Sequence, residues 1–328
     1  MNNIQNLQLP DFSDLHLLVV GDVMIDRYIT GNISRISPEA PVPILELGTS
    51  ENRMGGAANV ALNLSALGAS VTLLSIIGDD EEGKLMEGMF SSYSNIDQVF
   101  LTITGRKTTV KTRIMSSNQH ILRIDNENTD EITLDYQKRV TELFSKIIRD
   151  SKIDGVILQD YNKGLMTEGV IKNIIRISND KQIPTFVDPK FKNFFAYQNC
   201  TFFKPNQKEI SIALGPNSFS LDQIDEKLRQ MLNHKITFIT LGGTGIYTND
   251  GIKSNIFSVK NRTISDVCGA GDTVISTASL CYLKNLTIDQ IAIISNIAGG
   301  QVCEKPGVVS VDKEDLNKEI KNEKHTRL

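Results

Sequence analysis

The sequence predicts an α/β protein of three layers, in which helices cover both faces of a central, mostly parallel β-sheet. Short apolar runs that end in glycine alternate along the chain with stretches of helical periodicity. This alternation is typical of parallel strands joined by crossover helices. Two further stretches, rich in Thr, Val and Ile, break the alternation and predict a second, smaller β-sheet.

The amino-terminal half supplies the first strands and helices. Residues 15–21 (LHLLVVG) form an apolar run that is typical of a buried strand. Residues 55–68 (GGAANVALNLSALG) carry small and apolar residues at helical spacing and stop at a glycine. Residues 70–78 predict the next buried strand, and residues 134–149 have the apolar stripe of an amphipathic helix.

The carboxyl-terminal half continues the same alternation. Its apolar runs predict strands at residues 154–160, 184–190, 200–206 and 235–245, the last of which runs into a glycine-rich turn. Its periodic stretches predict helices at residues 168–178, 224–232, 269–283 and 288–302.

The stretches at residues 28–50 and 98–125 are expected to form one small sheet outside the main layer. Ligands of open α/β folds bind at the carboxyl ends of the strands, so we expect this sheet to act as a lid over that edge. Residues 1–328 are expected to be a single domain with the lid inserted in its core, since no linker composition interrupts them. Open strand edges on such a lid predict a homodimer.

The composition excludes several classes of protein. A net charge of −4 gives no broad basic surface, so nucleic acid is not expected as a partner. No apolar run reaches the roughly 18 residues of a membrane span. The polar first residues lack the layout of a secretion signal, and we therefore expect a cytoplasmic protein. The four cysteines form no C-x-x-C pair, and the four histidines have no metal-binding spacing.

Residues 266–273 (DVCGAGDT) carry the strongest sign of chemistry. Gly269, Ala270 and Gly271 stand directly before a predicted helix, where backbone N–H groups and the helix dipole bind anions. Asp272 would repel a phosphate there, unless it has the separate task of accepting a proton from an attacking hydroxyl. The residues alone leave open that Asp272 only stabilises the first turn of the helix.

Polar residues near two early glycines are candidates for binding a ligand. Gly55 and Gly56 let the backbone approach a ligand closely, and Asn59 offers it both a donor and an acceptor. Asp22 and Asp26 follow the first strand, where carboxylates can accept hydrogen bonds from sugar hydroxyls. The alternatives are a tight turn packed against a helix and two solvated loop acids.

Asn206 and Glu209 begin a predicted helix and are candidates for binding magnesium. Residues three apart share a helix face, and oxygen ligands suit Mg²⁺, which is usually held through water and substrate phosphates. A capping box is the alternative explanation. Residues 78–85 (GDDEEGKL) have P-loop spacing, but they lack its Ser or Thr and carry four acids that would repel phosphates. LGGTG at residues 241–245 is too short for a dinucleotide fingerprint.

Together these motifs resemble the ribokinase family, also called PfkB carbohydrate kinases, over residues 15–312. MGGAANVALNLSALGA is similar to the first signature of the family and SDVCGAGDTVISTAS to the second, with Val267 in place of the usual Thr. The resemblance implies a ribokinase-like fold and phosphoryl transfer to a sugar with ATP and Mg²⁺. It implies Asp272 as catalytic base, the Gly269–Gly271 amides as anion hole, Asn206 and Glu209 for Mg²⁺–ATP, with the metal held by Glu209 through water, and Asp26, Gly55, Gly56 and Asn59 as sugar contacts.

Further stretches resemble the heptose 7-phosphate kinase branch of this family, namely RISPEAPVP, RIMSSNQHILRIDNE, LQDYNKGLMT and VDPK. This resemblance implies phosphorylation of the anomeric O1 of D-glycero-β-D-manno-heptose 7-phosphate. The product would be the 1,7-bisphosphate, a precursor of ADP-heptose and lipopolysaccharide. The H-x-G-H motif of the nucleotidyltransferase that follows in many relatives is absent, so adenylylation is not expected.

A substrate that already bears a phosphate needs a cation near the sugar pocket. The candidates are Arg53, Arg113, Arg123, Lys163 and Lys190, of which Lys190 could instead face the ATP phosphates. Asp160 completes the substrate candidates, and Gly242 and Gly245 complete the nucleotide candidates. Two alternatives stay open: a kinase of this family for another sugar, and a sugar-binding regulator without activity. The intact G-A-G-D argues against the regulator, because a sensor needs no base.

Overall fold

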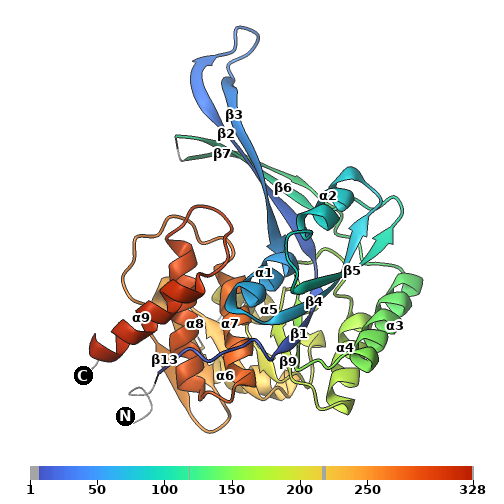
Figure 1. The fold of residues 1–328 in the computed structure, drawn as a ribbon, viewed down its shortest axis with the longest axis vertical. Helices are drawn as coiled ribbons and strands as arrows, with labels where there is room; N and C mark the ends of the chain where they lie inside the picture. The colour runs from blue at the N-terminus through green and yellow to red at the C-terminus, as the bar shows by residue number, and fades with distance from the viewer. Residues whose placement is uncertain (1–6, 118, 216–218, 327–328) are drawn as a thin grey trace.

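The computed structural model describes residues 7–117, 119–215 and 219–326 and confirms the α/β class (Figure 1). The centre of the molecule is a nine-stranded sheet with the order β13-β12-β11-β10-β9-β8-β1-β4-β5. Neighbours from β5 to β11 pair in parallel, and β12 and β13 are antiparallel. The strands are β1 (His16–Gly21), β4 (Ser70–Gly78), β5 (Ile96–Ile103), β8 (Gly155–Gln159), β9 (Thr185–Asp188), β10 (Phe202–Phe203), β11 (Ile236–Thr240), β12 (Ile246–Asn249) and β13 (Ser254–Phe257).

The central strand β1 shows how apolar runs build two cores. Leu17 and Val19 point into one cluster of buried side chains, and Leu18 and Val20 point into the other. Successive side chains of a strand face opposite sides, so a strand that is apolar throughout must be covered on both faces.

Helices provide that cover in two layers. One face packs against α1 (Ala57–Leu67), α2 (Glu81–Met89), α7 (Ala270–Leu283), α8 (Ile288–Cys303) and α9 (Lys313–Thr326). The other face packs against α3 (Leu134–Asp150), α4 (Glu168–Asp180), α5 (Gln207–Leu214) and α6 (Leu221–Leu232). Two short 3₁₀ turns, η1 (Phe194–Ala196) and η2 (Gly242–Thr244), complete the structure. No helix of the described ranges combines the length and the apolar character needed to cross a membrane.

A four-stranded sheet with the order β3-β2-β6-β7 rises from the body (Figure 1). Its strands are β2 (Val23–Ile36), β3 (Pro43–Gly56), β6 (Val110–Ser116) and β7 (Gln119–Asn126). The expected extent of this sheet needs a correction, because residues 98–103 belong to β5 at the edge of the main sheet. The buried residues Leu101 and Ile103 pack into the main core, and their alternation does not tell which sheet a strand joins.

The P-loop-like residues 78–85 form the capped start of α2. Asp80 Oδ1 accepts a hydrogen bond from the Gly83 amide at 2.8 Å, which is an ordinary helix cap. This geometry agrees with the rejection of a P-loop from the acids in this segment.

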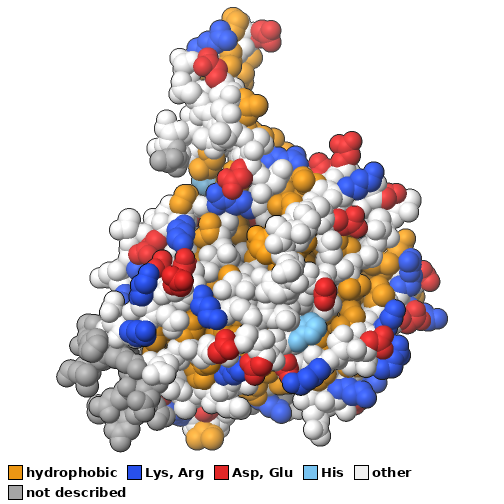
Figure 2. All heavy atoms as spheres, in the orientation of Figure 1, with side chains coloured by type: hydrophobic (Ala, Val, Ile, Leu, Met, Phe, Trp, Pro, Cys, Tyr) orange, Lys and Arg blue, Asp and Glu red, His pale blue; other side chains and the backbone are white. Residues whose placement is uncertain are grey.

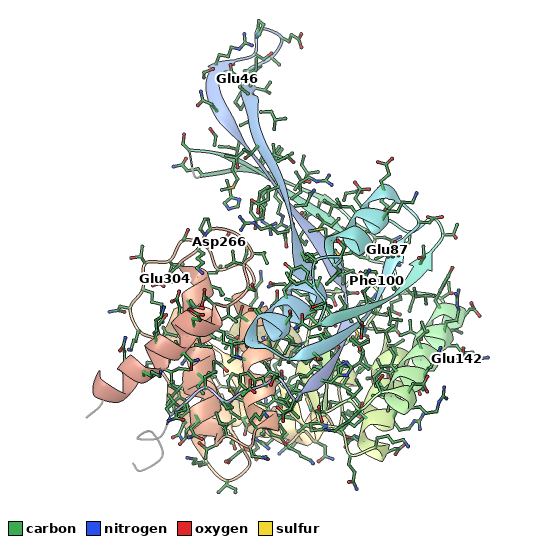
Figure 3. The ribbon with its side chains drawn as sticks, viewed as in Figure 1. Glu46, Glu87, Phe100, Glu142, Asp266 and Glu304 are labelled. Carbon is green, nitrogen blue, oxygen red and sulfur yellow. The ribbon has the colours of Figure 1, made fainter. Side chains whose placement is uncertain are left out.

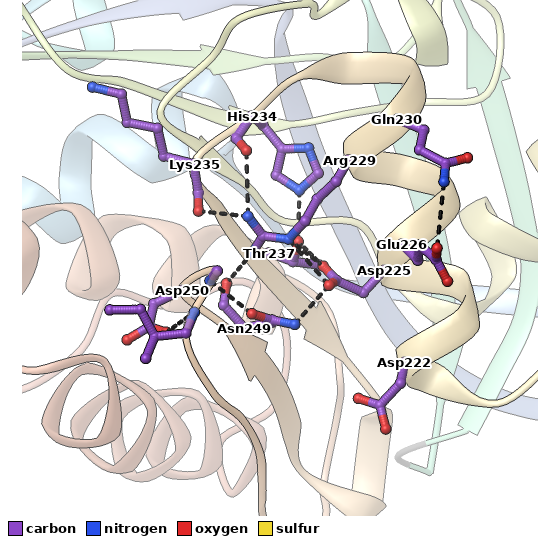
Figure 4. A network of polar contacts seen from close by, with 12 residues as sticks. Asp222, Asp225, Glu226, Arg229, Gln230, His234, Lys235, Thr237, Asn249 and Asp250 are labelled. Atoms are coloured by element: carbon purple, nitrogen blue, oxygen red, sulfur yellow. Dashed lines mark hydrogen bonds and ion pairs between the residues drawn. The ribbon is translucent and has the colours of Figure 1, made fainter.

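A buried polar network ties α6 to the antiparallel side of the main sheet (Figure 4). Arg229 Nε donates to both oxygens of Asp225 at 3.1 Å, and Asn249 Nδ2 donates to Asp225 Oδ2 at 2.7 Å. Burial, followed by the charge of Arg229, lowers the pKa of His234 to about 3, so this ring stays neutral next to Thr237. The network fixes α6 against strands β11 and β12.

Candidate active site

A cavity of about 610 Å³ lies where β9, β10 and β11 end. Its walls come from the segments after these strands, the start of α7 and one side of α8. Clefts of roughly 300–1,000 Å³ are typical of sites for small ligands. The candidate residues that line it are Lys190, Asn206, Gly242, Gly245, Gly269, Ala270 and Gly271, together with Tyr161, Asp188 and Lys204.

The amino terminus of α7 forms one wall of this cavity. Gly269 has a φ of 81°, in the left-handed region that favours glycine. A Cβ at this position would lie 2.8 Å from Asn59 Nδ2, so the available space also requires glycine. The amide of Ala270 donates to Val267 O at 3.3 Å, which is a long bond that an anion could compete with. The helix dipole favours an anion at this wall.

Asp272 lies in the first turn of α7 with only 2% of its surface exposed. Asn59 Nδ2 donates to its Oδ2 at 2.8 Å. Gln159 Nε2 and Tyr161 Oη donate to its Oδ1 at 3.0 Å and 2.8 Å. The donors come from α1 and from the end of β8 with the turn that follows it, so two distant parts of the chain orient one carboxylate.

Opposing influences set the proton affinity of Asp272. Burial raises its pKa, and the negative charge of Asp188 acts in the same direction. The hydrogen bonds from Asn59 and Tyr161 and the charge of Lys204 lower it, and the result is a pKa of about 7. A carboxylate with this pKa can accept a proton near neutral pH and release it again.

Two lysine–carboxylate pairs lie at the cavity, which Asp188, Lys190 and Lys204 help to line. Lys204 Nζ lies 2.9 Å from Asp188 Oδ1, and Lys190 Nζ forms an ion pair with Glu209 Oε1. Gln159 Nε2 also donates to Asp188 Oδ2 at 3.1 Å, which joins this cluster to Asp272. The arrangement offers two cations to the phosphates of a nucleotide.

Glu209 and Asn206 form the capping box that the sequence left open as an alternative. Asn206 Oδ1 accepts from the Glu209 amide, and Glu209 Oε2 accepts from the Asn206 amide, both at 2.9 Å. Burial, followed by the negative charge of Asp188, raises the pKa of Glu209, while Lys190 opposes the rise.

Magnesium fits this donor set only through water. In the described ranges, no three or more His, Cys, Asp or Glu side chains group together as direct ligands of a metal. Both oxygens of Glu209 are already engaged, by Lys190 and by the Asn206 amide. Mg²⁺ usually keeps several waters and binds through substrate phosphates, so Glu209 would act on its water shell.

The base of the small sheet supplies the sugar-side candidates. Asp26 on β2 and Arg113 on β6 form a buried ion pair. A Cβ at Gly55 would lie 2.1 Å from Asp26 Oδ2, so glycine is required where β3 passes this carboxylate. Arg113 Nη2 also lies 3.9 Å from Cys268 Sγ, which places the pair beside the loop that leads into α7.

Asn59 and Gly56 lie at the start of α1. Gly56 is the N-cap residue, with a φ of 61°. The side chain of Asn59 donates to Asp272, and its Oδ1 accepts from Asn63 Nδ2 at 3.2 Å. The structure therefore makes Asn59 a partner of Asp272, and both polar atoms that were expected to face a sugar have partners within the protein.

Asp22 and Asp160 hold a turn. Asp22 Oδ2 accepts from the amides of Tyr161 and Lys163 at 2.9 Å and 3.0 Å. Asp160 accepts from the Asn162 amide at 2.7 Å and from a tyrosine hydroxyl at 2.9 Å. Both carboxylates are buried, and these hydrogen bonds come from within the protein.

The sequence missed four residues of the site, namely Gln159, Tyr161, Asp188 and Lys204. Gln159 and Asp188 are the last residues of β8 and β9, and Tyr161 and Lys204 follow β8 and β10 closely. These strands are neighbours in the sheet, so their carboxyl ends meet at one edge. Polar residues at consecutive strand ends were the signal that could have found them.

A parallel α/β sheet, a glycine-led helix with a buried base at its start and a lysine-lined cavity together define a phosphate-transferring site. A family model described as pfkB family carbohydrate kinase matches residues 14–315. The chain belongs to this family, and it is a carbohydrate kinase.

Curated relatives narrow the comparison. The chain is 37% identical over 297 residues to bifunctional protein HldE of Campylobacter curvus, covering 89% of this chain and 62% of that protein. It is 38% identical over 304 residues to the protein of the same name from Campylobacter jejuni, covering 92% of this chain and 63% of that one. The chain thus spans somewhat less than two thirds of the length of these relatives.

Solved structures share the fold. Phosphofructokinase-2 from Escherichia coli in complex with potassium superposes with a TM-score of 0.77 at 18% identity, covering 94% of this chain and 98% of that one. The same enzyme in complex with fructose-6-phosphate gives a TM-score of 0.76 at 16% identity, with the same coverage. At this identity the likeness concerns the fold alone.

Proposed function

We propose that this kinase transfers the γ-phosphoryl group of ATP to a sugar hydroxyl with Asp272 as general base. The observation that carries the proposal is the buried carboxylate of Asp272, with a pKa of about 7, at the glycine-led end of α7. The adjacent wall of Gly269–Gly271 and the cations Lys190 and Lys204 suit an anion whose charge grows during transfer. Magnesium, when bound with the nucleotide, would neutralise further phosphate charge.

The proposed acceptor is D-glycero-β-D-manno-heptose 7-phosphate, phosphorylated at O1. Two observations support this choice: the RISPEAPVP run of the small sheet and the relatives named HldE, a bifunctional heptose kinase and adenylyltransferase. The 1,7-bisphosphate would serve ADP-heptose and lipopolysaccharide synthesis. The small sheet would act as the lid that excludes water from the transfer.

Two of the candidate cations for the substrate phosphate already form ion pairs with glutamates of the protein. Lys163 Nζ lies 2.8 Å from Glu127 Oε1, on a side chain that is only 13% exposed. Lys190 pairs with Glu209 and lines the nucleotide cavity. Neither lysine is therefore the best candidate for the far end of a sugar phosphate.

Arg53 is also engaged elsewhere. Its guanidinium donates to Glu51 at 2.8 Å and to the carbonyl oxygens of residues 306 and 308 at 2.7 Å and 3.3 Å. These contacts tie β3 to the loop after α8. Arg113 and Arg123 are paired with carboxylates as well, and what distinguishes them is that they face each other across two strands.

Arg113 and Arg123 stand directly opposite each other in the β6–β7 pair. Like charges in this position destabilise a sheet unless an anion lies between them. Arg113 is buried against Asp26, and Arg123 pairs with Asp125 at an exposed position. Guanidinium groups suit phosphate because they are planar and can donate two parallel hydrogen bonds to its oxygens. We therefore assign the substrate phosphate to these two arginines.

A substrate screen with ADP release as its readout tests the acceptor. We expect heptose 7-phosphate to exceed fructose 1-phosphate, nucleosides and unphosphorylated heptose in kcat/KM. Preference for an unphosphorylated sugar would reject the acceptor and favour a kinase for another sugar.

The arginine assignment has its own test in the same assay. Arg123→Ala should raise the KM for the phosphorylated sugar about tenfold, the typical loss of one charged hydrogen bond, and leave the KM for ATP unchanged. Arg149→Ala, at the exposed end of α3, is the matched control. An equal rise for phosphorylated and unphosphorylated sugars would contradict the assignment.

We also propose that two copies pair through their small sheets. β3 and β7 are the outer strands of this sheet, and outer strands are ready to pair with another chain. Exposed apolar side chains cluster on it, and Figure 2 shows this surface in orange along the raised part of the molecule.

A further inference from the structure

The turn after β8 places a phenol directly on the proposed base. Tyr161 Oη donates to Asp272 Oδ1 at 2.8 Å, and Lys190 Nζ lies 5.1 Å from the centre of the Tyr161 ring. Burial, followed by the charge of Asp272, raises the pKa of Tyr161 well above its usual value, so the phenol keeps its proton and remains a donor.

The donors around Asp272 leave a defined place for the acceptor hydroxyl. A carboxylate offers about four acceptor positions, two on each oxygen. Gln159 and Tyr161 occupy both positions of Oδ1, whereas Asn59 occupies one of Oδ2. The remaining position on Oδ2 can accept the sugar hydroxyl.

Gln159 supports this assignment of atoms. Its Nε2 faces two carboxylates, Asp272 and Asp188, so the amide hydrogens must point to them. Its Oε1 is buried without a partner in the described part of the chain. The protein thus tolerates an unpaired carbonyl in order to keep the Oδ1 side of Asp272 occupied.

Asp22 fixes the turn that carries Tyr161. Its carboxylate accepts from the amides of Tyr161, Lys163 and Leu165 at 2.9, 3.0 and 3.3 Å. Three bonds to one carboxylate leave this backbone segment little freedom. Because β1 and β8 are neighbours in the sheet, Asp22 holds the turn from the adjacent strand end.

We propose that Tyr161 is a positioning residue that orients Asp272 for proton transfer, and that Asp22 holds Tyr161 in place. The inference rests on the proposed role of Asp272 as base. In the step itself the sugar O–H bond breaks and its proton moves to Oδ2. The sugar oxygen bonds to the γ-phosphorus, and ADP leaves with the electron pair of the broken P–O bond.

The charges and hydrogen bonds around Asp272 decide the direction in which its pKa shifts when Tyr161 is replaced. Asp188 on β9 raises its pKa, and Lys204 after β10 lowers it; Lys190 lies over the ring of Tyr161. The bond from Tyr161 stabilises the ionised form and lowers the pKa. Its removal must therefore raise the pKa.

The test is the pH profile of kcat/KM for the sugar, measured on the full chain between pH 5 and pH 9. The wild-type profile should lose activity below a midpoint of about 7, the pKa of Asp272. Tyr161→Phe should move this midpoint upward by about one pH unit, which lowers the rate at pH 6 about tenfold relative to wild type. Asp22→Asn should shift it in the same direction.

Tyr197→Phe is the matched control. Tyr197 Oη donates to Asp160 Oδ2 at 2.9 Å, so this variant also loses a buried bond from a phenol to a carboxylate. It should keep the wild-type midpoint. A uniform fall in rate with an unchanged midpoint in Tyr161→Phe would overturn the role of Tyr161, and an unshifted Asp22→Asn would overturn that of Asp22.

The outcome separates this inference from the proposed function. If Asp272→Asn keeps wild-type turnover, the base assignment itself fails. If Asp272→Asn is inactive while Tyr161→Phe keeps the wild-type midpoint, only the positioning role fails.

Discussion

Asp272 shows how one side chain acquires a property that its neighbours give it. An aspartate in water has a pKa near 3.9 and is a weak base. Burial and the negative charge of Asp188 raise its pKa, and the hydrogen bonds from Asn59 and Tyr161 limit the rise to a pKa of about 7. A base is most effective when its pKa lies near the working pH.

Replacement of Asp272 by Asn should separate chemistry from binding. The amide keeps the shape of the side chain but cannot accept the proton, so turnover should fall by about three orders of magnitude. The Kd for ATP should change less than about threefold, because in the proposed arrangement the phosphates bind at the wall of α7 and at the lysines. ADP release and calorimetric titration with ATP measure the two quantities, and near-wild-type turnover would remove Asp272 from the base role.

Asp160 offers a prediction about stability. Burial, followed by the charge of Asp22, raises its pKa to about 7. Between about pH 4 and pH 7 the folded chain therefore holds a proton that the unfolded chain releases, so this contribution to stability is lost as the pH rises. The free energy of unfolding of wild type should fall relative to Asp160→Asn over this range, as measured by urea denaturation. A difference that is constant with pH would contradict the prediction.

Strand β3 connects the small sheet to the site. Its last residues, Gly55 and Gly56, run past Asp26 and into α1. A side chain in this place would displace the carboxylate that pairs with Arg113. Glycine at position 55 is therefore required by the Asp26–Arg113 pair, which we propose lies on the sugar side of the site.

Gly55→Ala tests this role of β3. The new Cβ would lie 2.1 Å from Asp26 Oδ2, so the pair with Arg113 must shift. We expect the KM for the sugar to rise at least about tenfold, the usual effect of one lost charged contact, with an unchanged KM for ATP. Gly88→Ala in α2 is the control, because a Cβ there meets nothing within 4 Å. Equal effects on both KM values would contradict the role.

Elements with a clear period and a glycine stop could be predicted from the sequence. Strands β1 and β4 and helices α1 and α7 lie within two residues of their expected bounds. The antiparallel strands β12 and β13 were not predicted, since their runs of four residues are too short for a period to show. β5 was assigned to the wrong sheet, because partner choice depends on tertiary contacts.

The whole molecule is a body with a raised sheet. Glu46 marks the far end of this sheet, and Asp266 lies on the loop of the body below it (Figure 3). Exposed apolar residues lie along the sheet, among them Leu47 at 69% and Leu122 at 54% exposure. Such exposure on one element is more than scattered surface residues explain.

Leu47→Glu tests the proposed dimer. A charge on this surface should weaken pairing of two sheets, and the dimer dissociation constant should rise at least about tenfold, or about 1.4 kcal/mol. Sedimentation at a series of concentrations measures it. Ile252→Glu, at a 93% exposed position of the body, is the control. A wild-type chain that is monomeric at all concentrations would reject the dimer.

The site could be predicted only where it lies in motifs. Asp272 and Glu209 stand in short sequence patterns, and both lie next to residues that line the cavity, Asp272 after Gly271 and Glu209 in an ion pair with Lys190. Tyr161, Gln159 and Asp188 became visible only with the strand order, because their role depends on which strand ends are neighbours. Asp22 and Asp160 were candidates for sugar contacts, and in the structure Asp22 accepts from backbone amides while Asp160 accepts from one amide and from the Tyr197 hydroxyl.

The three donors to Asp272 have a consequence for how the enzyme comes into being. They lie 213, 113 and 111 residues from it along the chain. Contacts between residues so far apart in the sequence are expected to form late in folding. The reason is that the entropy cost of closing the long loops between them must be overcome first. Until then Asp272 is an ordinary exposed acid. If Asp272 is the base, as we propose, a partly folded chain would lack it and would not hydrolyse ATP before its sheet is complete.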